Sequence, residues 1–452
     1  MSRPSTTWPD DPLPELARRA ATRPAVVLDD DPTGTQTLRD VTVLADWDSK
    51  TIGRHLDDPV VFLSTNSRSL DGPAAAMLAH QAVTAAMGAG RPISLVSRSD
   101  STLRGHFVAE TRAIAAAMGA PDARIVLAPF FGEGGRVTVD DVHLLERDGV
   151  RTPVGESEFA RDATFGFRSS NLREWVAEKY AAAGLLPPPM VSLSLAMLRG
   201  EGPDAVAEAI GNLAAGGVAI ANAETERDIE VVALGALQAE EVGLSLVART
   251  AASYVRARAG RPPAPRLAAG EVASGPAGLI VVGSHVPTTS RQLAVLLGSP
   301  AGARIAAHEL SVEGILAGDQ TTLVEVAASL DRTLAAGRIG LMATERVRRD
   351  VDLASGRRIS QALVDVVRRL ERRPDWVIAK GGITSSDIAA HGLGMRESRV
   401  AGQLLPGVPI WIGGHESRWP GLPLVVFPGN VGGPTALADA AGLLDAPAQP
   451  KA

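Results

Sequence analysis

The sequence predicts an α/β protein built of two Rossmann-like α/β domains whose sheets are mostly parallel. Short apolar runs alternate with alanine-rich segments of helical length, as in parallel sheets joined by crossover helices. The chain has 452 residues, which is more than one ordinary core holds, so two domains are expected. A break rich in Pro, Gly and Ala at 258–278 separates the two halves.

The apolar runs of the first half are nearly continuous, which is typical of strands buried on both faces of a sheet. Segments of helical composition lie between them, for example at 72–90 and 103–120. The predicted strands of this half are 25–29, 60–65, 93–98, 124–129 and 217–223.

The second half resumes the same alternation after the break. Its boundaries predict an N-terminal domain at 20–258, a linker at 259–277 and a C-terminal domain at 278–442. The predicted strands of the second domain are 278–284, 304–310, 339–344, 376–382 and 422–430.

The composition argues against several classes of function. A formal net charge of −6 offers no basic surface for nucleic acid. Cysteine is absent, so disulfides, a thiolate nucleophile and Cys-bound zinc are excluded. No run of about 18 apolar residues predicts a membrane span. Residues 1–12 lack the apolar core of a signal peptide, and we expect a cytoplasmic protein.

Several common catalytic motifs are missing from the sequence. No G-x-G-x-x-G follows a predicted strand, and no G-x-x-x-x-G-K-[ST] occurs. G-x-S-x-G and H-E-x-x-H are also absent. These absences argue against the usual dinucleotide, P-loop, hydrolase and metalloprotease solutions, but they leave other ways of binding phosphate open.

Small polar and charged residues follow the first four apolar runs. Ligands of open α/β sheets bind beyond the carboxyl ends of the strands. Arginines present a planar fork to carboxylates, and Asp, Ser and Thr bind hydroxyl groups, so the set favours a small, anionic, hydroxylated ligand. For any one residue, turn formation or helix capping remains an alternative. The candidates are Asp30, Asp31 and Asp100 as proton acceptors, and Thr33, Arg68, Arg98, Ser101 and Arg104 as substrate-binding residues.

Glycine turns follow three predicted strands of the second half. Glycine lets backbone N–H groups approach phosphate oxygens, so turns that meet at one sheet edge would form a nucleotide site. Each glycine could instead serve only a tight turn. Lys380 is either a phosphate contact or a solvated strand end, and the rarity of lysine favours the contact. The candidates are Ser284, Lys380, Gly381, Gly382, Thr384, Gly429, Asn430 and Gly432.

Four motifs together resemble the four-carbon acid sugar kinase family, over about residues 20–440. They are "DDPTGT" at 30–35, "DSTLRG" at 100–105, "GGITS" at 381–385 and "GNVG" at 429–432. The resemblance implies a sugar-acid-binding N-terminal domain, a nucleotide-binding C-terminal domain and an active site in the cleft between them. This chain departs from the family pattern at Pro32, Thr35 and the pair Phe427 and Pro428, which points to a divergent subgroup.

The resemblance further implies ATP-dependent phosphorylation, with Mg²⁺, of a terminal hydroxyl on a four-carbon sugar acid such as threonate, erythronate or an oxo-tetronate. No metal ligands are assigned, and a homo-oligomer is compatible with the sequence. Two alternatives remain at this point: a sugar-acid dehydrogenase or isomerase, and a non-catalytic two-lobed protein that binds a sugar acid.

Overall fold

The computed structural model describes residues 10–272, 275–346 and 353–446. These residues form two compact units that are not simple halves of the chain. The first contains the described residues up to Thr37 together with Asp46–Pro263, and the second contains Leu38–Ala45 and the described residues from Ala264 onward. The segment Leu38–Ala45 falls inside the range predicted for the N-terminal domain but packs in the second unit.

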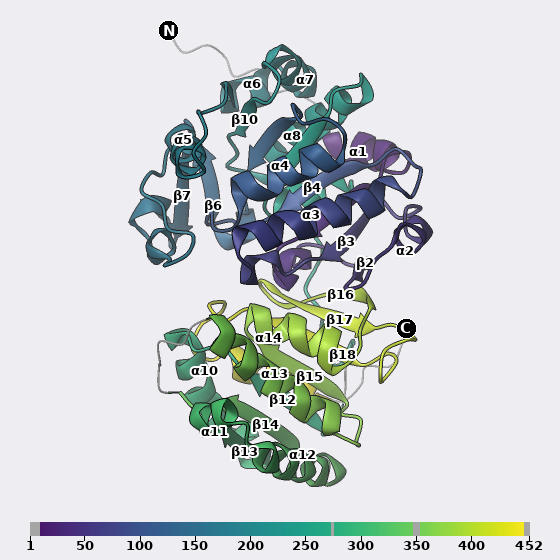
Figure 1. Cartoon of the computed structure of the whole chain (residues 1–452), viewed down its shortest axis with the longest axis vertical. Coiled ribbons are helices and arrows are strands. Elements are labelled where there is room, and N and C mark those ends of the chain that lie inside the picture. Colours follow the sequence, from purple (N-terminus) through teal and green to yellow (C-terminus); the bar gives the residue numbers. More distant parts are fainter. Residues whose placement is uncertain (1–9, 273–274, 347–352, 447–452) are drawn as a thin grey trace. The chain divides into compact units, whose positions relative to one another are not determined.

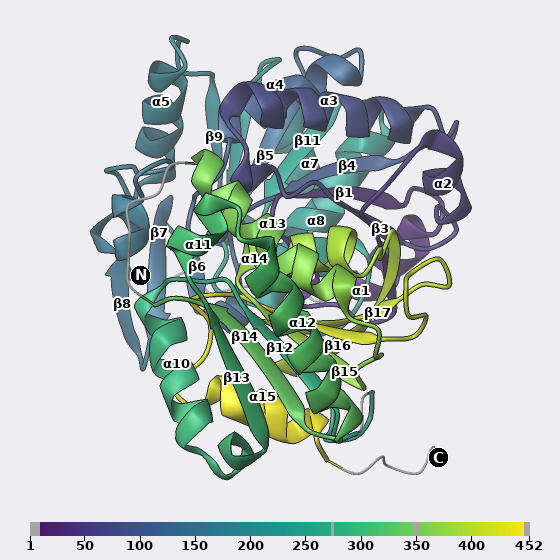
Figure 2. The same ribbon diagram turned by 60° about the horizontal axis from the view of Figure 1, so that its bottom comes forward.

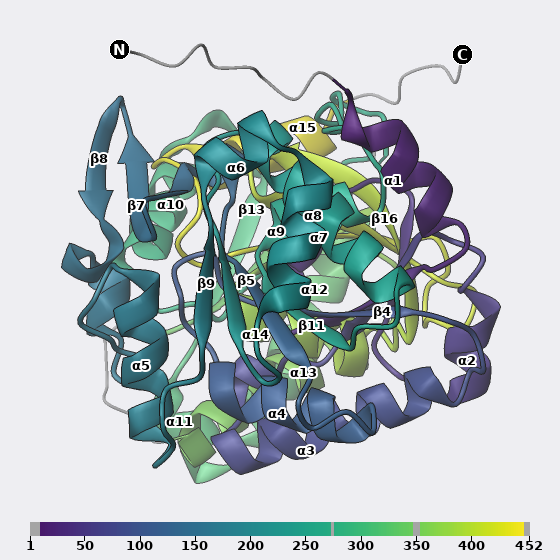
Figure 3. The same ribbon diagram turned by 90° about the horizontal axis from the view of Figure 1, so that it is seen from above.

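The first unit is built on a parallel sheet of seven strands. Two groups of helices cover its faces: α3 (Gly72–Met87) with α4 (Phe107–Ala117), and α1 (Pro12–Ala20) with α7 (Pro203–Asn212), α8 (Glu226–Glu241) and α9 (Ala252–Arg258) (Figures 1 and 3). The strand order is β3 (Val60–Ser64), β1 (Ala25–Asp29), β4 (Ser94–Arg98), β11 (Leu246–Thr250), β5 (Arg124–Ala128), β10 (Val218–Ala221) and β9 (Met190–Leu193).

The helices of this unit begin at polar caps that the sequence supplies. The Asp71 side chain accepts a hydrogen bond from the backbone N–H of Ala74 at the start of α3. Thr225 and Asp228 form a reciprocal capping box at the start of α8. The remaining helices of the unit are α2 (Ser49–Arg54), α5 (Leu172–Ala182) and α6 (Leu195–Gly200).

A small antiparallel sheet, which the sequence analysis did not predict, lies beside α5 in the first unit (Figure 1). Its strands are β6 (Arg136–Val139), β7 (Val142–Arg147) and β8 (Val150–Pro153). They are short, and polar residues interrupt them, so they lack the apolar runs that marked the other strands.

The second unit combines a parallel sheet with an antiparallel extension. Helices α12 (Gln320–Ala335), α13 (Leu353–Arg369) and α14 (Gly382–Asp387) lie on one face, and α10 (Pro287–Gly298) and α15 (Ala436–Leu444) pack together on the other (Figure 2). A short helix, α11 (Val312–Ala317), packs on α13. The parallel strands are β13 (Ile305–Leu310), β14 (Ile339–Thr344), β12 (Gly278–Val282), β15 (Trp376–Lys380) and β18 (Pro423–Phe427), in that order.

The antiparallel extension contains β17 (Val408–Gly413), β16 (Glu397–Leu405) and β2 (Val41–Leu44). Strand β2 comes from the early segment of the chain and pairs with β16. The prediction of an α/β protein with two domains and mostly parallel sheets is therefore confirmed.

The central strands of both sheets are buried along their whole length, as expected where helices cover both faces. In the described part of the chain, no helix is long and apolar enough to cross a bilayer.

Candidate functional site

Charged residues lie at or just after the ends of three adjacent parallel strands of the first unit. Asp29 is the last residue of β1, and Asp30 and Asp31 follow it. Arg98 ends β4, and Arg68 lies in a short turn just after β3. Because β1 lies between β3 and β4, the fold brings the two arginines to the same sheet edge as the three aspartates.

Arg68 binds both of the aspartates that follow β1. Its Nη2 lies 2.5 Å from Oδ1 of Asp30 and its Nε lies 3.2 Å from Oδ2, a bidentate pairing. Its Nη1 lies 3.2 Å from Oδ2 of Asp31. Ser99 adds a hydrogen bond of 3.0 Å to Asp30, whose side chain is only 3% exposed. Asp30 is thus held from two sides and has little access to a ligand.

Asp31 is the most exposed of the three predicted proton acceptors, at 19% of its side chain. It is also the N-cap of a 3₁₀ helix, Pro32–Thr35, because its Oδ1 accepts the N–H of Thr33 at 3.0 Å and the Thr33 hydroxyl at 2.6 Å. Pro32 suits the first position of that helix because no partner is needed for a backbone N–H there. Burial raises the pKa of Asp31, but the charges of Arg68 and Arg98 outweigh it, so its pKa lies below the ordinary value.

A second charged group follows β4. Asp100 accepts a hydrogen bond of 2.6 Å from Nε of Arg104 and another from the Thr102 hydroxyl. Burial opposes ionisation of Asp100, but Arg104 and Arg68 overcome it and hold its pKa well below the ordinary value. Arg104 lies over the ring of Phe159 at 5.0 Å. Ser101 is half-buried, and its carbonyl oxygen lies 2.8 Å from Nε2 of His143.

Asp29 is fully buried beneath this cluster. Its Oδ1 accepts a hydrogen bond of 3.2 Å from Nη1 of Arg98. Gly34 packs directly onto the carboxyl group, since a Cβ at that position would lie 2.5 Å from Cγ of Asp29. Burial raises the pKa of Asp29 to about 8, against the opposing charge of Arg98. Asp29 therefore supports the site from below.

The raised pKa of Asp29 predicts a pH dependence of folding. The unfolded state loses this proton near pH 4, whereas the folded state keeps it up to about pH 8. Between these pH values Asp29 is ionised in the unfolded chain but protonated in the folded chain. The free energy of unfolding therefore falls as the pH rises, by up to about 1.4 kcal/mol per pH unit. Asp29→Asn is expected to flatten that slope, measured by urea unfolding at pH 5, 6, 7 and 8. Parallel pH curves for the two proteins would contradict the buried-acid assignment.

A buried network that no sequence pattern predicted lies behind the aspartates. Arg249 donates to the Ser97 hydroxyl at 2.7 Å and forms an ion pair with Glu110, which also accepts from Ser67. Arg249 lies in the strand "LVART", whose apolar character could have flagged a strand end. Glu110 lies in the first turn of α4, where an acidic residue is commonplace and carries no signal.

The three glycine turns of the second unit lie together beyond β12, β15 and β18. Ser284 follows β12, Gly381 and Gly382 follow β15, and Gly429 follows β18. A Cβ on Gly429 would lie 2.5 Å from the Ser284 hydroxyl oxygen, and one on Gly381 would lie 3.0 Å from that of Thr384. Gly381 also has a φ of +124°, which favours glycine. The turns are too closely packed to accept side chains.

The remaining predicted nucleotide residues differ in their exposure. Asn430 and Gly432 are exposed, and Gly432 has a φ of +86°. Lys380, by contrast, is fully buried, with its Nζ 2.5 Å from the carbonyl oxygen of Pro428. Sequence analysis missed Gln292, a buried residue of α10 whose Nε2 donates to three successive carbonyls, those of residues 431–433. Its position in a helix gave no sign of that contact.

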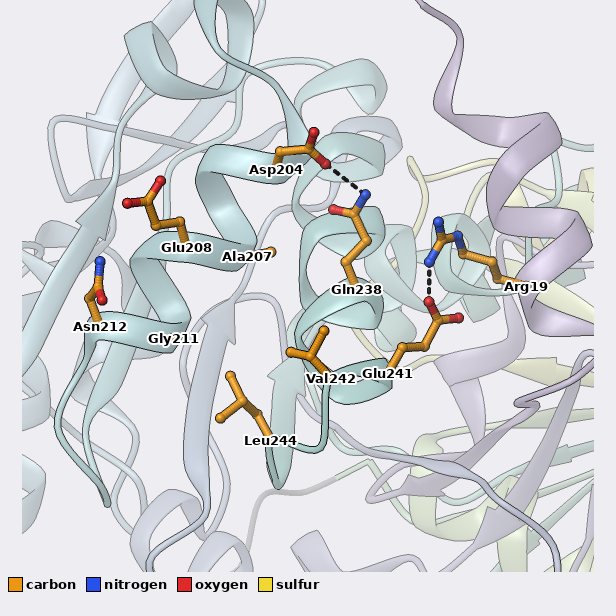
Figure 4. Close-up of a pocket in the computed structure, with 10 residues that line it drawn as sticks. All are labelled: Arg19, Asp204, Ala207, Glu208, Gly211, Asn212, Gln238, Glu241, Val242 and Leu244. Atoms are coloured by element: carbon orange, nitrogen blue, oxygen red, sulfur yellow. Dashed lines mark hydrogen bonds and ion pairs between the residues drawn. The ribbon is translucent and has the colours of Figure 1, made fainter.

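The first unit also contains a surface groove of about 530 Å³ that involves none of the predicted site residues. It lies between α7 and α8, where Asp204 accepts a hydrogen bond from Gln238 (Figure 4). An ion pair between Arg19 and Glu241 closes one side of the groove (Figure 4). We assign no ligand to it.

Comparison with known proteins assigns different ligands to the two parts of the chain. Residues 25–258 match a family model described as the sugar-binding N-terminal domain, and residues 279–437 match one described as the nucleotide-binding C-terminal domain. The chain is thus a two-domain protein with a sugar-binding and a nucleotide-binding part. It belongs to the four-carbon acid sugar kinase family.

The individual relatives compared below share 29% or less of their residues with this chain. The D-erythronate kinase of Heliobacterium modesticaldum is 29% identical over 238 residues, which are 52% of this chain and 49% of that protein. The match therefore spans about half the length of this curated relative. A solved Salmonella typhimurium LT2 protein has a TM-score of 0.68 at 17% identity, covering 92% of this chain and 98% of its own. A Haemophilus influenzae protein has a TM-score of 0.64, also at 17% identity, covering 93% and 100%. These two structures support the fold alone.

Proposed function

We propose that the protein is an ATP-dependent kinase that phosphorylates a terminal hydroxyl of a four-carbon sugar acid. The observation that carries the proposal is the cluster at the carboxyl ends of β1, β3 and β4, where arginines and aspartates alternate in a sugar-binding domain. Such a cluster offers cationic forks to a carboxylate and anionic oxygens to hydroxyl groups. The relation to a D-erythronate kinase supports an acid of this size.

Arg104 is the residue that we propose to bind the substrate carboxylate. All three nitrogens of Arg68 are within 3.2 Å of Asp30 or Asp31, so its guanidinium is already engaged. Arg104 has one strong contact, from Nε to Asp100, and its Nη1 lies 3.7 Å from Asp162. The guanidinium of Arg104 is therefore less engaged than that of Arg68, and the edge that carries Nη1 can pair with a substrate carboxylate.

Asp31 is the residue that we propose to accept the proton of the reacting hydroxyl. It is more exposed than Asp30 and Asp100, and Arg68 and Thr33 fix its orientation. A carboxylate with a lowered pKa is a weak base, but phosphoryl transfer relies on positioning and charge neutralisation more than on base strength.

The glycine turns suit a nucleotide because they follow three adjacent strand ends and carry no side chains that would keep phosphate oxygens from the backbone N–H groups. Ser284, Gly381, Thr384 and Gly429 would hold it. ATP would supply the phosphoryl group, and Mg²⁺ would neutralise phosphate charge. Within the described residues, no group of three or more His, Cys, Asp or Glu side chains could hold a metal ion. Mg²⁺ commonly binds through substrate phosphates and one or two carboxylates, so the proposal needs no such cage.

The function is tested by a screen for ADP release with ATP, Mg²⁺ and a small library of four- and five-carbon sugar acids. We expect release that depends on one or a few four-carbon acids, with D-erythronate and threonate among the first to test. A change in nicotinamide absorbance with these acids would instead favour a dehydrogenase. Tight binding of an acid without any nucleotide binding would favour a non-catalytic protein.

Replacing Arg104 with Lys tests the carboxylate assignment. Lysine keeps the charge but loses the planar fork, so the KM for the sugar acid is expected to rise about 10- to 100-fold, with a smaller change in kcat. Arg91→Lys is the matched control, because Arg91 pairs with Asp57 on the surface of the same unit. Steady-state kinetics with saturating ATP give both constants. An unchanged KM in Arg104→Lys would remove Arg104 from the substrate site.

A further inference from the structure

Lys380 is a buried cation in the nucleotide-binding domain. It ends β15, and no part of its side chain reaches the surface. Its Nζ donates to the carbonyl oxygen of Pro428 at 2.5 Å, and the carbonyl of Gly429 lies 3.4 Å away. The ammonium also lies 3.8 Å from the centre of the Phe427 ring. These contacts all lead to the turn that follows β18.

An apolar side chain would fill this position without burying a charge. Moving an ammonium out of water without a counter-ion is costly. Among the described residues, no carboxylate forms an ion pair with Lys380, and burial lowers its pKa to about 7. The cost indicates that the lysine contributes something that an apolar residue could not, and its contacts are to backbone carbonyls.

Other residues hold the neighbouring carbonyls in the same way. The N–H of Gly381 donates to the Phe427 carbonyl at 2.8 Å, and the Thr289 hydroxyl donates to that of Gly429 at 2.9 Å. Further along the loop, Gln292 donates to the carbonyls of residues 431–433. Carbonyls along 427–433 are therefore engaged by the body of the domain.

Most amide groups of the same loop are not engaged. Within the described part of the chain, the N–H groups of residues 429, 430, 432 and 433 donate no hydrogen bond. A run of backbone N–H groups without partners, in a glycine-rich loop, is a typical anion site. Because the domain binds the carbonyl groups of the loop, its free N–H groups remain available to donate to phosphate oxygens.

We propose that Lys380 is a positioning residue that fixes the 428–430 turn for nucleotide binding without touching the nucleotide. The inference rests on the proposed function, which places the nucleotide at the glycine turns. It replaces both earlier interpretations of Lys380, as a phosphate contact and as a solvated strand end. It also assigns a role to the two residues that depart from the family pattern. The Phe427 ring packs against the Lys380 ammonium, and the Pro428 carbonyl accepts a hydrogen bond from it.

Lys380→Met tests the proposal, because methionine has a similar length but no donor and no charge. Without nucleotide, we expect faster hydrogen exchange of the Gly381 amide, which donates to the Phe427 carbonyl beside the turn. We also expect the Kd for ADP, measured by calorimetry, and the KM for ATP to rise about 10- to 100-fold, while the KM for the sugar acid stays within twofold. The thermal midpoint at pH 6 is expected not to fall, because the variant removes a buried charge.

Lys179→Met is the matched control. Lys179 also donates to two backbone carbonyls, those of Phe165 and Gly166, and lies 5.8 Å from a phenylalanine ring, but it belongs to the sugar-binding unit. Its replacement is expected to leave exchange of the Gly381 amide and the Kd for ADP unchanged. Equal effects of the two variants on ADP binding would overturn the proposal.

Three further outcomes are decisive. Wild-type exchange of the Gly381 amide together with wild-type ADP affinity in Lys380→Met would overturn the positioning assignment. If Lys380→Met does not fold, Lys380→Gln replaces it in the test, because glutamine retains a donor group. An equal loss of affinity for ADP and for the sugar acid in Lys380→Gln would also overturn the assignment. If wild-type protein binds no ADP while exchange still depends on Lys380, the proposed kinase function fails and the fastening of the turn stands.

Discussion

Asp31→Asn is expected to lower kcat about 10²- to 10⁴-fold, with little change in the KM for either substrate. The amide keeps the size of the side chain and can still accept hydrogen bonds from Thr33 through its oxygen. It cannot take the proton of the reacting hydroxyl, and it loses the charge that pairs with Arg68. The measurement is steady-state turnover of the acid that the screen identifies.

Asp57→Asn is the control for this variant, because Asp57 is 92% exposed and lies in the same unit. Circular dichroism and thermal unfolding check that the Asp31 variant is folded. Full turnover in a folded Asp31→Asn protein would show that Asp31 is not the proton acceptor, and Asp100 would become the next residue to test.

Gly34→Ala is expected to lower the free energy of unfolding by about 3 kcal/mol. The added Cβ would overlap the carboxyl group of Asp29, which is fully buried and bonded to Arg98, so neither side can move away easily. Urea unfolding of wild type and variant at pH 6 gives the difference.

Gly53→Ala is the matched control in the same unit. A Cβ at Gly53 would meet only the Cβ of Ala89, at 3.9 Å, and the residue lies in α2. Alanine is favoured over glycine in helices, so this variant is expected to be as stable as wild type or more stable by up to about 1 kcal/mol. If Gly34→Ala behaved like the control, the close packing over Asp29 would be wrong.

Much of the fold followed from the alternation of apolar runs with helical segments. The runs 25–29 and 124–129 correspond to β1 and β5, because buried parallel strands need continuous apolar stretches. Strands β6 to β8 were not predicted because they are short and polar residues interrupt their apolar ones. The membership of β2 in the second unit was out of reach, since it depends on pairing with β16, more than 350 positions away.

The candidate site was predictable in its residue types but not in its pairings. Strand ends marked Asp30, Asp31 and Arg68, because ligands of parallel sheets gather there. That Arg68 is engaged by both aspartates depends on the order of three strands, which no local pattern encodes. Similarly, rarity drew attention to Lys380, but only the packing around β15 reveals that it is buried under the turn it holds.

The central claim is that the protein transfers a phosphoryl group from ATP to a four-carbon sugar acid with the help of Asp31. Transfer of label from [γ-³²P]ATP to the acid, followed by separation of the product, tests it most directly. We predict labelled sugar acid with wild-type protein and Mg²⁺, and at least about 100-fold less with Asp31→Asn. Failure of wild-type protein to label any four-carbon acid, or equal labelling by the two proteins, would contradict the account.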